Sequence, residues 1–321
     1  MVERVVAVAF PGQGSQRPGM GRDFYENISA SRRVYEEASD ALGWDVAALC
    51  FGDDEKLDLT EYTQPCIVTT EIAMLRGLCE RYGFSPSLFG GHSLGELTAL
   101  IAAGVVSLSV ALKIVQTRGR LMQSVMPVGL GGMAAVISPE INLAVIRTAL
   151  SPLPMDVANV NSGSQVVISG ASRALPEAQR CLLDAITNGQ PLRFVPLNVS
   201  APFHSRFMRP VEEPFEEILR SVRGHVNSEK AKKVTSNYTG GFHSGSAEDI
   251  VSNLVAQVSN TVLWMDNMKH LASRADVIYE IGPNRPLRDF FKTMGVACQS
   301  ITTLSSAERH FNRGSQRIAD S

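Results

Sequence analysis

The segment 91–95, GHSLG, fits the pattern G-x-S-x-G and lies between two segments of different character. The short apolar segment 87–90 precedes it, and the helix-forming stretch 96–103 follows it. A serine on a sharp turn between a strand and a helix projects its hydroxyl group from the edge of the sheet. The next backbone N–H then lies at a helix N-terminus, where it can stabilise an oxyanion. This setting predicts an α/β fold with Ser93 as a nucleophile, although a serine that only caps the helix fits the same pattern.

Strand and helix patterns alternate along both ends of the chain. Apolar runs bounded by turn residues predict strands at 5–10 and 276–281. Charge and periodicity predict helices at 23–42, 70–81 (amphipathic), 107–126, 211–223 and 247–258. Gly104 suits the C-terminal cap of the helix after the serine, and Ser107 suits the start of the next helix. This alternation indicates an α/β body.

The middle of the chain has another order of elements. Its patterns predict β-α-β-β-α-β at 133–138, 139–150, 155–160, 165–171, 175–187 and 192–199. This is the ferredoxin-like order, and Gly129, Gly131 and Gly132 before it form a predicted hinge. We expect a discontinuous α/β body of residues 1–127 and 198–305, an inserted ferredoxin-like subdomain of residues 128–197, and a polar, frayed tail over residues 306–321.

Composition excludes several classes of protein. Of the 321 residues, 44% are apolar and 19% charged, which argues against disorder, and a formal charge of -2 argues against a general nucleic-acid binder. Five scattered cysteines without a CxxC pair argue against a disulfide framework. The N-terminal apolar run is too short for a signal peptide, and the uncharged run between Glu96 and Lys113 contains turn residues. We expect a soluble, cytoplasmic protein with neither a nucleic acid nor a membrane as partner.

An activated serine needs a general base, and six histidines could supply it. His225 lies in a charged stretch and His310 in the tail, so both are expected at the surface. His92 adjoins the serine on a tight turn and therefore points elsewhere. His204 lies just after a predicted strand, where sites on α/β sheets tend to lie, although an ordinary loop histidine fits that place equally well. No acidic partner stands out, so a Ser-His dyad and a full triad both remain open.

Helical phase singles out Arg118. At about 100° per residue, Arg118 falls within the apolar arc of the helix predicted at 107–126, whereas Arg120 falls on the opposite side. A guanidinium directed inward needs an anion, and its fork fits a carboxylate through two parallel hydrogen bonds. That anion could be the carboxylate of a ligand or a buried acid of the protein such as Glu96, and helical phase does not decide between them.

The loop PGQGSQ at 11–16 follows the first predicted strand. It fails as a dinucleotide-binding fingerprint, because that pattern requires glycine where Arg17 stands. A loop of this kind can instead lend a backbone N–H to an oxyanion hole, as in serine hydrolases, or it can be a plain turn. The sequence contains no phosphate-binding lysine loop and no metal-ligand spacing, so we predict no metal site.

Taken together, these residues resemble the malonyl-CoA:acyl carrier protein transacylase family, which includes the acyltransferase domains of polyketide synthases. The resemblance runs from Val5 to about Leu304, and its motifs occur in the family's order. They are FPGQGSQ at 10–16, TQP at 63–65, GHSLGE at 91–96, RGRLMQ at 118–123, NSGSQVVISG at 161–170, APFHS at 201–205, Gln257 and EIGP at 280–283. The resemblance implies an α/β-hydrolase-like body with a parallel sheet and an inserted ferredoxin-like α+β subdomain.

The resemblance also implies a role for each candidate residue. Ser93 would be the nucleophile and His204 its base. The backbone N–H groups of Gln13 and Leu94 would form the oxyanion hole, and Arg118 would bind the malonyl carboxylate. The other residues implied near the substrate are Gln64, Asn161, Phe203 and Gln257.

Three positions concern the choice of acyl group and the loop beside the pocket. Phe203 before the histidine and Leu94 after the serine are like the variants that select malonyl over bulkier methylmalonyl units. One side chain seldom settles such a choice. Gly163 stands where the family usually has proline, and we expect it to loosen that loop without touching the chemistry.

The implied activity moves a malonyl group from malonyl-CoA through an acyl-serine ester to the phosphopantetheine thiol of an acyl carrier protein, free or within a synthase. Two half-reactions at one site predict ping-pong kinetics, with no metal or redox cofactor. We expect a monomer that acts in trans. The segment 278–291 resembles the discrete acyltransferases of polyketide pathways more than those of fatty-acid synthesis. Candidates for a basic rim that docks an acidic carrier are Arg206, Arg209, Arg285, Arg288 and Lys292.

Three alternatives remain at this point. An acyl hydrolase that clears stalled acyl groups from carrier proteins would have no need of Arg118. An ordinary esterase would usually place its histidine near the C-terminus, whereas more than a hundred residues follow His204. A non-catalytic docking module predicts a degraded site, whereas the serine, histidine, arginine and glutamine loop are all intact.

Overall fold

Two sheets of different kind organise the chain, which a computed structural model describes over residues 4–186, 191–199 and 201–319. The first sheet is parallel, with the order β10-β9-β1-β2. Its strands are β1 (Val6–Phe10), β2 (Leu88–Gly91), β9 (Val277–Ile281) and β10 (Cys298–Ile301). Four of the five residues of β1 are buried, as expected of a central strand covered on both faces. With the separate antiparallel sheet, the predicted α/β fold class is confirmed.

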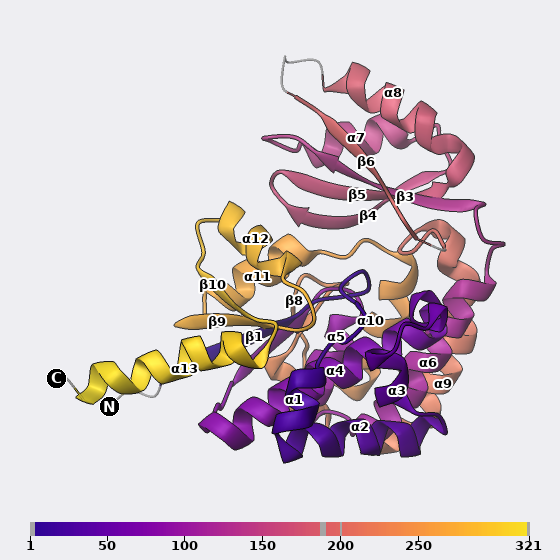
Figure 1. The fold of residues 1–321 in the computed structure, drawn as a ribbon. Helices are drawn as coiled ribbons and strands as arrows, with labels where there is room; N and C mark the ends of the chain where they lie inside the picture. Colours follow the sequence, from indigo (N-terminus) through magenta and orange to yellow (C-terminus); the bar gives the residue numbers. More distant parts are fainter. Residues whose placement is uncertain (1–3, 187–190, 200, 320–321) are drawn as a thin grey trace.

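Helices cover the parallel sheet (Figure 1). The helices before the antiparallel sheet are α1 (Arg22–Asn27), α2 (Ser29–Leu42), α3 (Val46–Phe51), α4 (Thr60–Tyr82), α5 (Gly95–Ala102) and α6 (Leu108–Ser124). Those after it are α9 (Glu212–Ser221), α10 (Ala247–Ser259), α11 (Trp264–Ala272), α12 (Pro286–Thr293) and α13 (Leu304–Ala319). Within the described ranges, no helix is both long enough and apolar enough to cross a membrane.

The antiparallel sheet forms a separate layer above the parallel one in Figure 1. Its order is β4-β5-β3-β6. The elements are β3 (Gly131–Ile137), α7 (Leu143–Leu150), β4 (Met155–Ser162), β5 (Gln165–Ala171), α8 (Leu175–Ala185) and β6 (Arg193–Leu197). This is the predicted β-α-β-β-α-β order, and the two helices bury a second apolar core against the strands. The helix predicted at 175–187 and the tail predicted at 306–321 both extend beyond the described residues.

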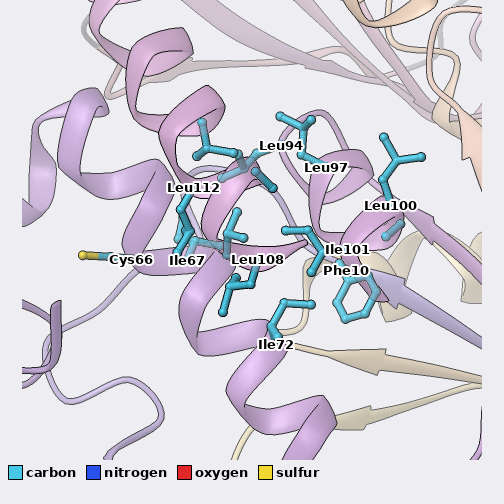
Figure 2. Close-up of a cluster of buried hydrophobic side chains, with 14 of the residues drawn as sticks. Phe10, Cys66, Ile67, Ile72, Leu94, Leu97, Leu100, Ile101, Leu108 and Leu112 are labelled. Carbon is cyan, nitrogen blue, oxygen red and sulfur yellow. The ribbon is translucent and has the colours of Figure 1, made fainter. Parts of the chain in front are cut away.

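The main core lies directly beneath α5, the helix that follows the candidate serine (Figure 2). Leu94, Leu97 and Ile101 from the start and inner face of this segment are buried there. Neighbouring apolar side chains in the same cluster are Phe10 of β1, Ile67 and Ile72 of α4, and Leu108 and Leu112 of α6. This packing fixes the start of α5 relative to α4 and α6, and therefore fixes the turn that carries Ser93.

The structure corrects two predicted helices. The helix predicted at 23–42 is divided at Ile28, whose extended backbone separates α1 from α2. The helix predicted at 70–81 begins already at Thr60 and is not amphipathic, because polar residues such as Gln64 and Thr69 are buried together with the apolar ones. A helix enclosed on all sides lacks the period that marks a half-exposed one. The helices α3, α11 and α12 and the strand β10 were not predicted. The small two-stranded sheet of β7 (Thr235–Ser236) and β8 (Gly241–Phe242) was not predicted either.

The predicted hinge at Gly129, Gly131 and Gly132 is also corrected. Gly131 and Gly132 begin β3, where both are buried. A Cβ on Gly131 would collide with the ring of Pro202, and one on Gly132 would lie 2.8 Å from Leu175. Glycine therefore serves close packing at these two positions rather than motion.

The predicted frayed tail is a helix, α13, over Leu304–Ala319. Leu304 and Ala307 are buried, and the ring of Phe311 stacks on Tyr82 with centroids 4.8 Å apart. Phe311 also stacks on Tyr279 of β9. A single apolar stripe therefore holds this segment against the body, and the polar residues between its members concealed that stripe in the sequence.

Helices α4 and α6 approach each other closely at Gly119. A Cβ on Gly119 would lie 2.5 Å from the carbonyl oxygen of Thr60 and 3.0 Å from the Cα atom of Glu61. Both are backbone atoms, so the two helices would have to separate to admit a side chain. Gly119 adjoins Arg118, and the spacing between these helices therefore sets what Arg118 can reach on α4.

We expect Gly119→Ala to lower the free energy of unfolding by about 1–2 kcal/mol, because overpacking costs more than the gain in helix propensity returns. Urea unfolding followed by circular dichroism measures this change. Gly163→Ala is the matched control, since a Cβ there meets nothing within 4 Å. An unfolding midpoint for Gly119→Ala at or above that of the wild type would contradict the close approach.

Candidate active site

Ser93 lies on the sharp turn between β2 and α5, residues 91–95, which we call the serine turn. Its backbone has φ of 52°, in the left-handed region that residues with a side chain seldom adopt. A Cβ on Gly91 would collide with Gly95, and a Cβ on Gly95 would collide with the carbonyl group of Phe10. Both flanking glycines are therefore required for the turn to pack against β1, which accounts for the spacing G-x-S-x-G.

His204 contacts Ser93 directly. Its Nε2 atom lies 2.6 Å from Ser93 Oγ, and its Nδ1 atom lies 2.8 Å from the backbone carbonyl oxygen of Gln257. A carbonyl oxygen can only accept, so Nδ1 carries the proton and Nε2 is the acceptor for the serine hydroxyl. Of the sequence alternatives, this geometry favours a Ser-His dyad in which a carbonyl takes the place of the acid.

The surroundings of His204 keep its imidazole neutral. Burial is the main cause that lowers the pKa of His204 to about 3, and the positive charge of Arg118 lowers it further. The hydrogen bond to Gln257 opposes this shift without cancelling it. His204 is also in the left-handed region, with φ of 57°, and within the described residues only Ser93 shares this property among non-glycine residues. Both residues of the pair are therefore held in backbone conformations that cost energy, as is common where a protein fixes reacting groups.

Arg118 is 1% exposed, as its helical phase predicts. Its Nη1 atom donates to Gln64 Oε1 at 3.0 Å, and its Nη2 atom donates to Gln257 Oε1 at 3.1 Å. Across the described ranges no carboxylate forms an ion pair with it, so the direct pair with Glu96 that the sequence left open is wrong. Burial lowers the pKa of Arg118 to about 10, and the nearby charge of Glu96 opposes that shift. The guanidinium remains cationic at neutral pH and has further N–H groups for an anion.

The two backbone N–H groups that the resemblance implies for an oxyanion hole have no partner in the described structure. They belong to Gln13 and Leu94, and both residues line the same cavity as Ser93. The N–H of Ser93 itself is taken by Asn237 Oδ1 at 3.2 Å. The positions implied for the oxyanion hole therefore carry donors that are available in this structure, one of them at the start of α5.

A cavity of about 540 Å³ lies between the two sheets and opens over the serine turn. Eight of the nine predicted site residues line it: Gln13, Gln64, Ser93, Leu94, Arg118, Asn161, Phe203 and His204. The ninth, Gln257, lies just behind the lining and contacts Arg118 and His204. Apolar side chains that the sequence did not single out complete the walls, among them Met122, Met133, Val167 and Phe290.

Asn161 joins the antiparallel sheet to the serine turn. Its Oδ1 atom lies 2.8 Å from Nε2 of His92, and its Nδ2 atom donates to Gln165 Oε1 at 2.9 Å. Burial lowers the pKa of His92, so a neutral ring donates Nε2–H to the amide oxygen. As the sequence predicts, His92 does not serve Ser93 as a base. It ties the two sheets together across the cavity instead.

Sequence reasoning missed the groups beneath the serine turn. Asn237 accepts the Ser93 N–H and donates to Gly91 O at 2.8 Å and to Glu96 Oε2 at 2.6 Å. His243 lies 2.9 Å from Glu96 Oε1, and both side chains are fully buried. Asn237 is one of several polar residues in the turn-rich stretch 235–246, and nothing in its sequence context marks it as buried.

The arrangement can carry an acyl group on Ser93. A neutral imidazole is in place to take the hydroxyl proton, and two backbone donors face the cavity in which a carbonyl oxygen would develop charge. The buried guanidinium beside them favours an acyl group that ends in a carboxylate. The site can therefore perform acyl transfer through an ester, with selection for an anionic acyl chain.

Comparison with a family model, with known sequences and with solved structures finds similarity to acyl transferases in each case. Residues 8–292 match the family model described as "Acyl transferase domain". A protein of Bacillus subtilis (strain 168) named "Malonyl CoA-acyl carrier protein transacylase" is 34% identical over 301 residues, which are 92% of each chain. A crystal structure of the protein of that name from Clostridium perfringens has a TM-score of 0.86 and 33% identity, and covers 99% of this chain and 100% of that one.

A second similar solved structure contains an acyl carrier protein bound to its own enzyme. Its title is "PlMCAT:AntF (holo): type II PKS acyl-carrier protein in complex with its malonyl-transacylase", and it has a TM-score of 0.88 and 31% identity. It covers 96% of this chain and 99% of that one. At such identity and coverage, the likeness extends to the whole fold and includes both sheets.

The depressed pKa of His204 predicts an unusual pH profile for acylation of Ser93. With p-nitrophenyl acetate, which has no carboxylate, we expect the rate to stay nearly flat from pH 8 down to about pH 5, because the imidazole stays neutral above its pKa of about 3. Arg118→Ala removes a positive charge that disfavours imidazolium, so the pKa of His204 rises and the acid limb moves to higher pH. Release of p-nitrophenolate measures both profiles.

The control is Arg120→Ala, which removes an exposed positive charge from the same helix. Its profile should follow the wild type. An acid limb near the ordinary histidine pKa of about 6.5 in the wild type would show that His204 is not desolvated.

Proposed function

Because this chain belongs to the acyl transferase domain family of malonyl-CoA:acyl carrier protein transacylases, we propose that it transfers a malonyl group from malonyl-CoA to the phosphopantetheine thiol of an acyl carrier protein. The observation that carries the proposal is Arg118, a buried cation near a Ser-His pair that forms an ion pair with none of the carboxylates in the described part of the chain. A malonyl thioester presents a carboxylate at the distance of one methylene group from its reacting carbonyl. Acyl groups without that charge would leave the guanidinium without a directly bound anion.

In the first half-reaction, His204 Nε2 takes the proton of Ser93 as its Oγ attacks the thioester carbonyl carbon. The N–H groups of Gln13 and Leu94 hold the negative oxygen of the tetrahedral intermediate. The carbon–sulfur bond then breaks, and His204 returns the proton to the leaving thiolate. CoA leaves as a thiol, and a malonyl ester remains on Ser93.

The second half-reaction repeats these steps with another thiol. His204 takes the proton of the phosphopantetheine thiol, whose sulfur attacks the ester carbonyl carbon. Collapse of the intermediate breaks the bond to Ser93 Oγ, which receives the proton from His204. The same groups serve both halves, which gives ping-pong kinetics. These steps use only side chains and backbone donors of the chain, so the proposal involves no cofactor and treats malonyl-CoA as substrate.

Three basic residues remain as candidates to dock an acidic carrier protein. Of the five that the sequence suggested, Arg206 is paired with Asp156 and Arg288 with Asp289. The other three are exposed and form no ion pair within the described ranges: Arg209, Arg285 and Lys292. Arg285 directly precedes Pro286, which lines the cavity. We therefore assign Arg285 the main role in holding the carrier at the opening.

The transferred malonyl group would supply chain extension in polyketide or fatty-acid synthesis. The relative solved with a type II polyketide synthase carrier supports the first of these. We place the reaction in the cytoplasm, where a chain with five free cysteine thiols stays reduced.

Intact-protein mass spectrometry after mixing with malonyl-CoA tests the first half-reaction. We expect a malonyl adduct on the wild type, none on Ser93→Ala, and formation slower by roughly 100-fold or more on Arg118→Ala, because the malonyl carboxylate loses a buried cationic partner. Arg120→Ala is the matched control, since its side chain is exposed on the same helix, and it should behave as the wild type. Addition of a holo carrier protein should then move the adduct to the carrier.

A hydrolase gives a different result in the same experiment. It forms no lasting malonyl adduct and releases free acid from acyl carrier proteins. In that case Arg118→Ala should not slow the reaction, and the assignment of Arg118 to the malonyl carboxylate would be wrong.

Charge reversal at Arg285 tests the docking assignment. We expect Arg285→Glu to raise KM for the carrier protein about 5- to 20-fold, because a cation that attracts the acidic partner becomes an anion that repels it. The rate of malonyl adduct formation from malonyl-CoA should change by less than about twofold. Steady-state transfer at varied carrier concentration measures KM for the carrier protein. Mass spectrometry of quenched samples measures the rate of malonyl adduct formation.

Lys113→Glu is the control for net charge, because Lys113 is exposed on α6 and does not line the cavity. Equal effects of the two reversals would mean that long-range attraction rather than a contact at Arg285 is being measured.

A further inference from the structure

A fully buried carboxylate lies behind the active site and touches none of the atoms that react. Glu96 is the second residue of α5, and four donors converge on it. Its Oε2 atom accepts from Asn237 N at 2.8 Å, Asn237 Nδ2 at 2.6 Å and Gln257 Nε2 at 2.7 Å. Its Oε1 atom lies 2.9 Å from His243 Nε2. Three of these partners can only donate, so we treat the group as a carboxylate and assign His243 the tautomer that presents Nε2–H to it.

Gln257 connects this carboxylate to Arg118. Its Nε2 atom donates to Glu96, while its Oε1 atom accepts from Arg118 Nη2 at 3.1 Å. The amide therefore lies between a buried anion and a buried cation and is oriented by both. Gln257 also binds His204, but through its backbone carbonyl group. The side chain of Gln257 thus holds the arginine, and its Nε2 atom also donates to the backbone carbonyl oxygen of Ser93 at 3.1 Å. The main chain of Gln257 holds the base.

His243 has no function in the proposed steps. It follows β8 (Gly241–Phe242), its side chain is fully buried, and its Nδ1 atom has no partner within the described residues. Burying the unpaired Nδ1 atom carries a free-energy cost. Within the described residues, the only polar contact of the His243 side chain is the one from Nε2 to Glu96. An apolar residue at this position would remove that cost. The arrangement therefore indicates that the contact to Glu96 is the reason for a histidine here.

We propose that His243 is a positioning residue, which holds Glu96 so that Gln257 keeps Arg118 aligned with the malonyl carboxylate. This inference rests on the proposed function. Without the Nε2–H of His243, Oε1 of Glu96 loses its only donor, and the carboxylate can rotate away from Gln257. The amide of Gln257 then keeps its hydrogen bond to Ser93 O but loses the shorter one to Glu96, so its oxygen is no longer fixed on Arg118. The backbone carbonyl of Gln257 still binds His204. Asn237, which accepts the N–H of Ser93, is still held by its hydrogen bond to Gly91 O, so we expect the Ser-His pair to keep its geometry.

The test compares two acyl donors on His243→Phe, which keeps an aromatic ring and removes the nitrogen atoms. Malonyl-CoA needs Arg118, whereas p-nitrophenyl acetate has no carboxylate and needs only the Ser-His pair. We expect kcat/KM for malonyl adduct formation to fall about tenfold, chiefly through KM, with acylation by p-nitrophenyl acetate within about twofold of the wild type. The ratio of the two rates on one preparation does not depend on the fraction that is folded.

Three further variants sharpen the result. His243→Gln restores an amide donor toward Glu96, so it should recover part of the malonyl rate. His270→Phe makes the same substitution at an exposed histidine and should leave the ratio unchanged. In an Arg118→Ala background, His243→Phe should have no further effect on malonyl adduct formation, because the two residues act through one path.

An equal loss with both donors would overturn the inference, since it indicates a general disturbance of the serine turn. An unchanged malonyl rate, or effects of His243→Phe and Arg118→Ala that multiply, would overturn it as well. If His243→Phe yields no folded protein, His243→Asn takes its place, because its shorter amide does not reach Glu96. A wild type that forms no malonyl adduct at all would refute the proposed function and this inference together, which is a different pattern from any of these.

Discussion

The active site depends on a positive charge placed where water does not reach. Burying a guanidinium costs several kcal/mol unless other groups compensate it. For Arg118 the compensation comes from Gln64 on α4, Gln257 on α10 and the nearby charge of Glu96 at the start of α5. These groups belong to separate segments of the chain, and Arg118 itself lies on α6. The cost of the charge is therefore met only when four helices have their native arrangement, which couples the binding site to the fold.

The same charge acts on the reaction in a second way. Arg118 contributes to the low pKa of His204, after burial. A histidine beside a buried cation cannot easily become charged, so it remains a base, and each imidazolium formed during a turnover is short-lived because it readily returns its proton. One residue thus selects an anionic acyl group and adjusts the base that activates the serine. Selectivity and reactivity are consequently not independent properties of this site.

Sequence reasoning could identify the groups that touch the substrate, because each carries a local signal. Ser93 is marked by its flanking glycines, and Arg118 by its phase on an apolar helix face. The groups behind the site carry no such signal. Asn237 and His243 lie among other polar residues in a turn-rich stretch, and only the folded chain brings them to Glu96. The errors at the helix predicted at 70–81 and at the tail predicted at 306–321 have a related cause. The enclosed α4 shows no amphipathic period, and α13 hides a narrow apolar stripe among polar residues.

Both residues of the Ser-His pair have a left-handed backbone, although neither is glycine. Conformations of this kind cost roughly 1–3 kcal/mol each, and that energy is withdrawn from a net stability of only about 5–15 kcal/mol. Glycine at either position would relieve the strain and at the same time remove a reacting group. Selection for stability and selection for activity therefore favour different residues at these two positions. Variants stabilised at these positions would be inactive.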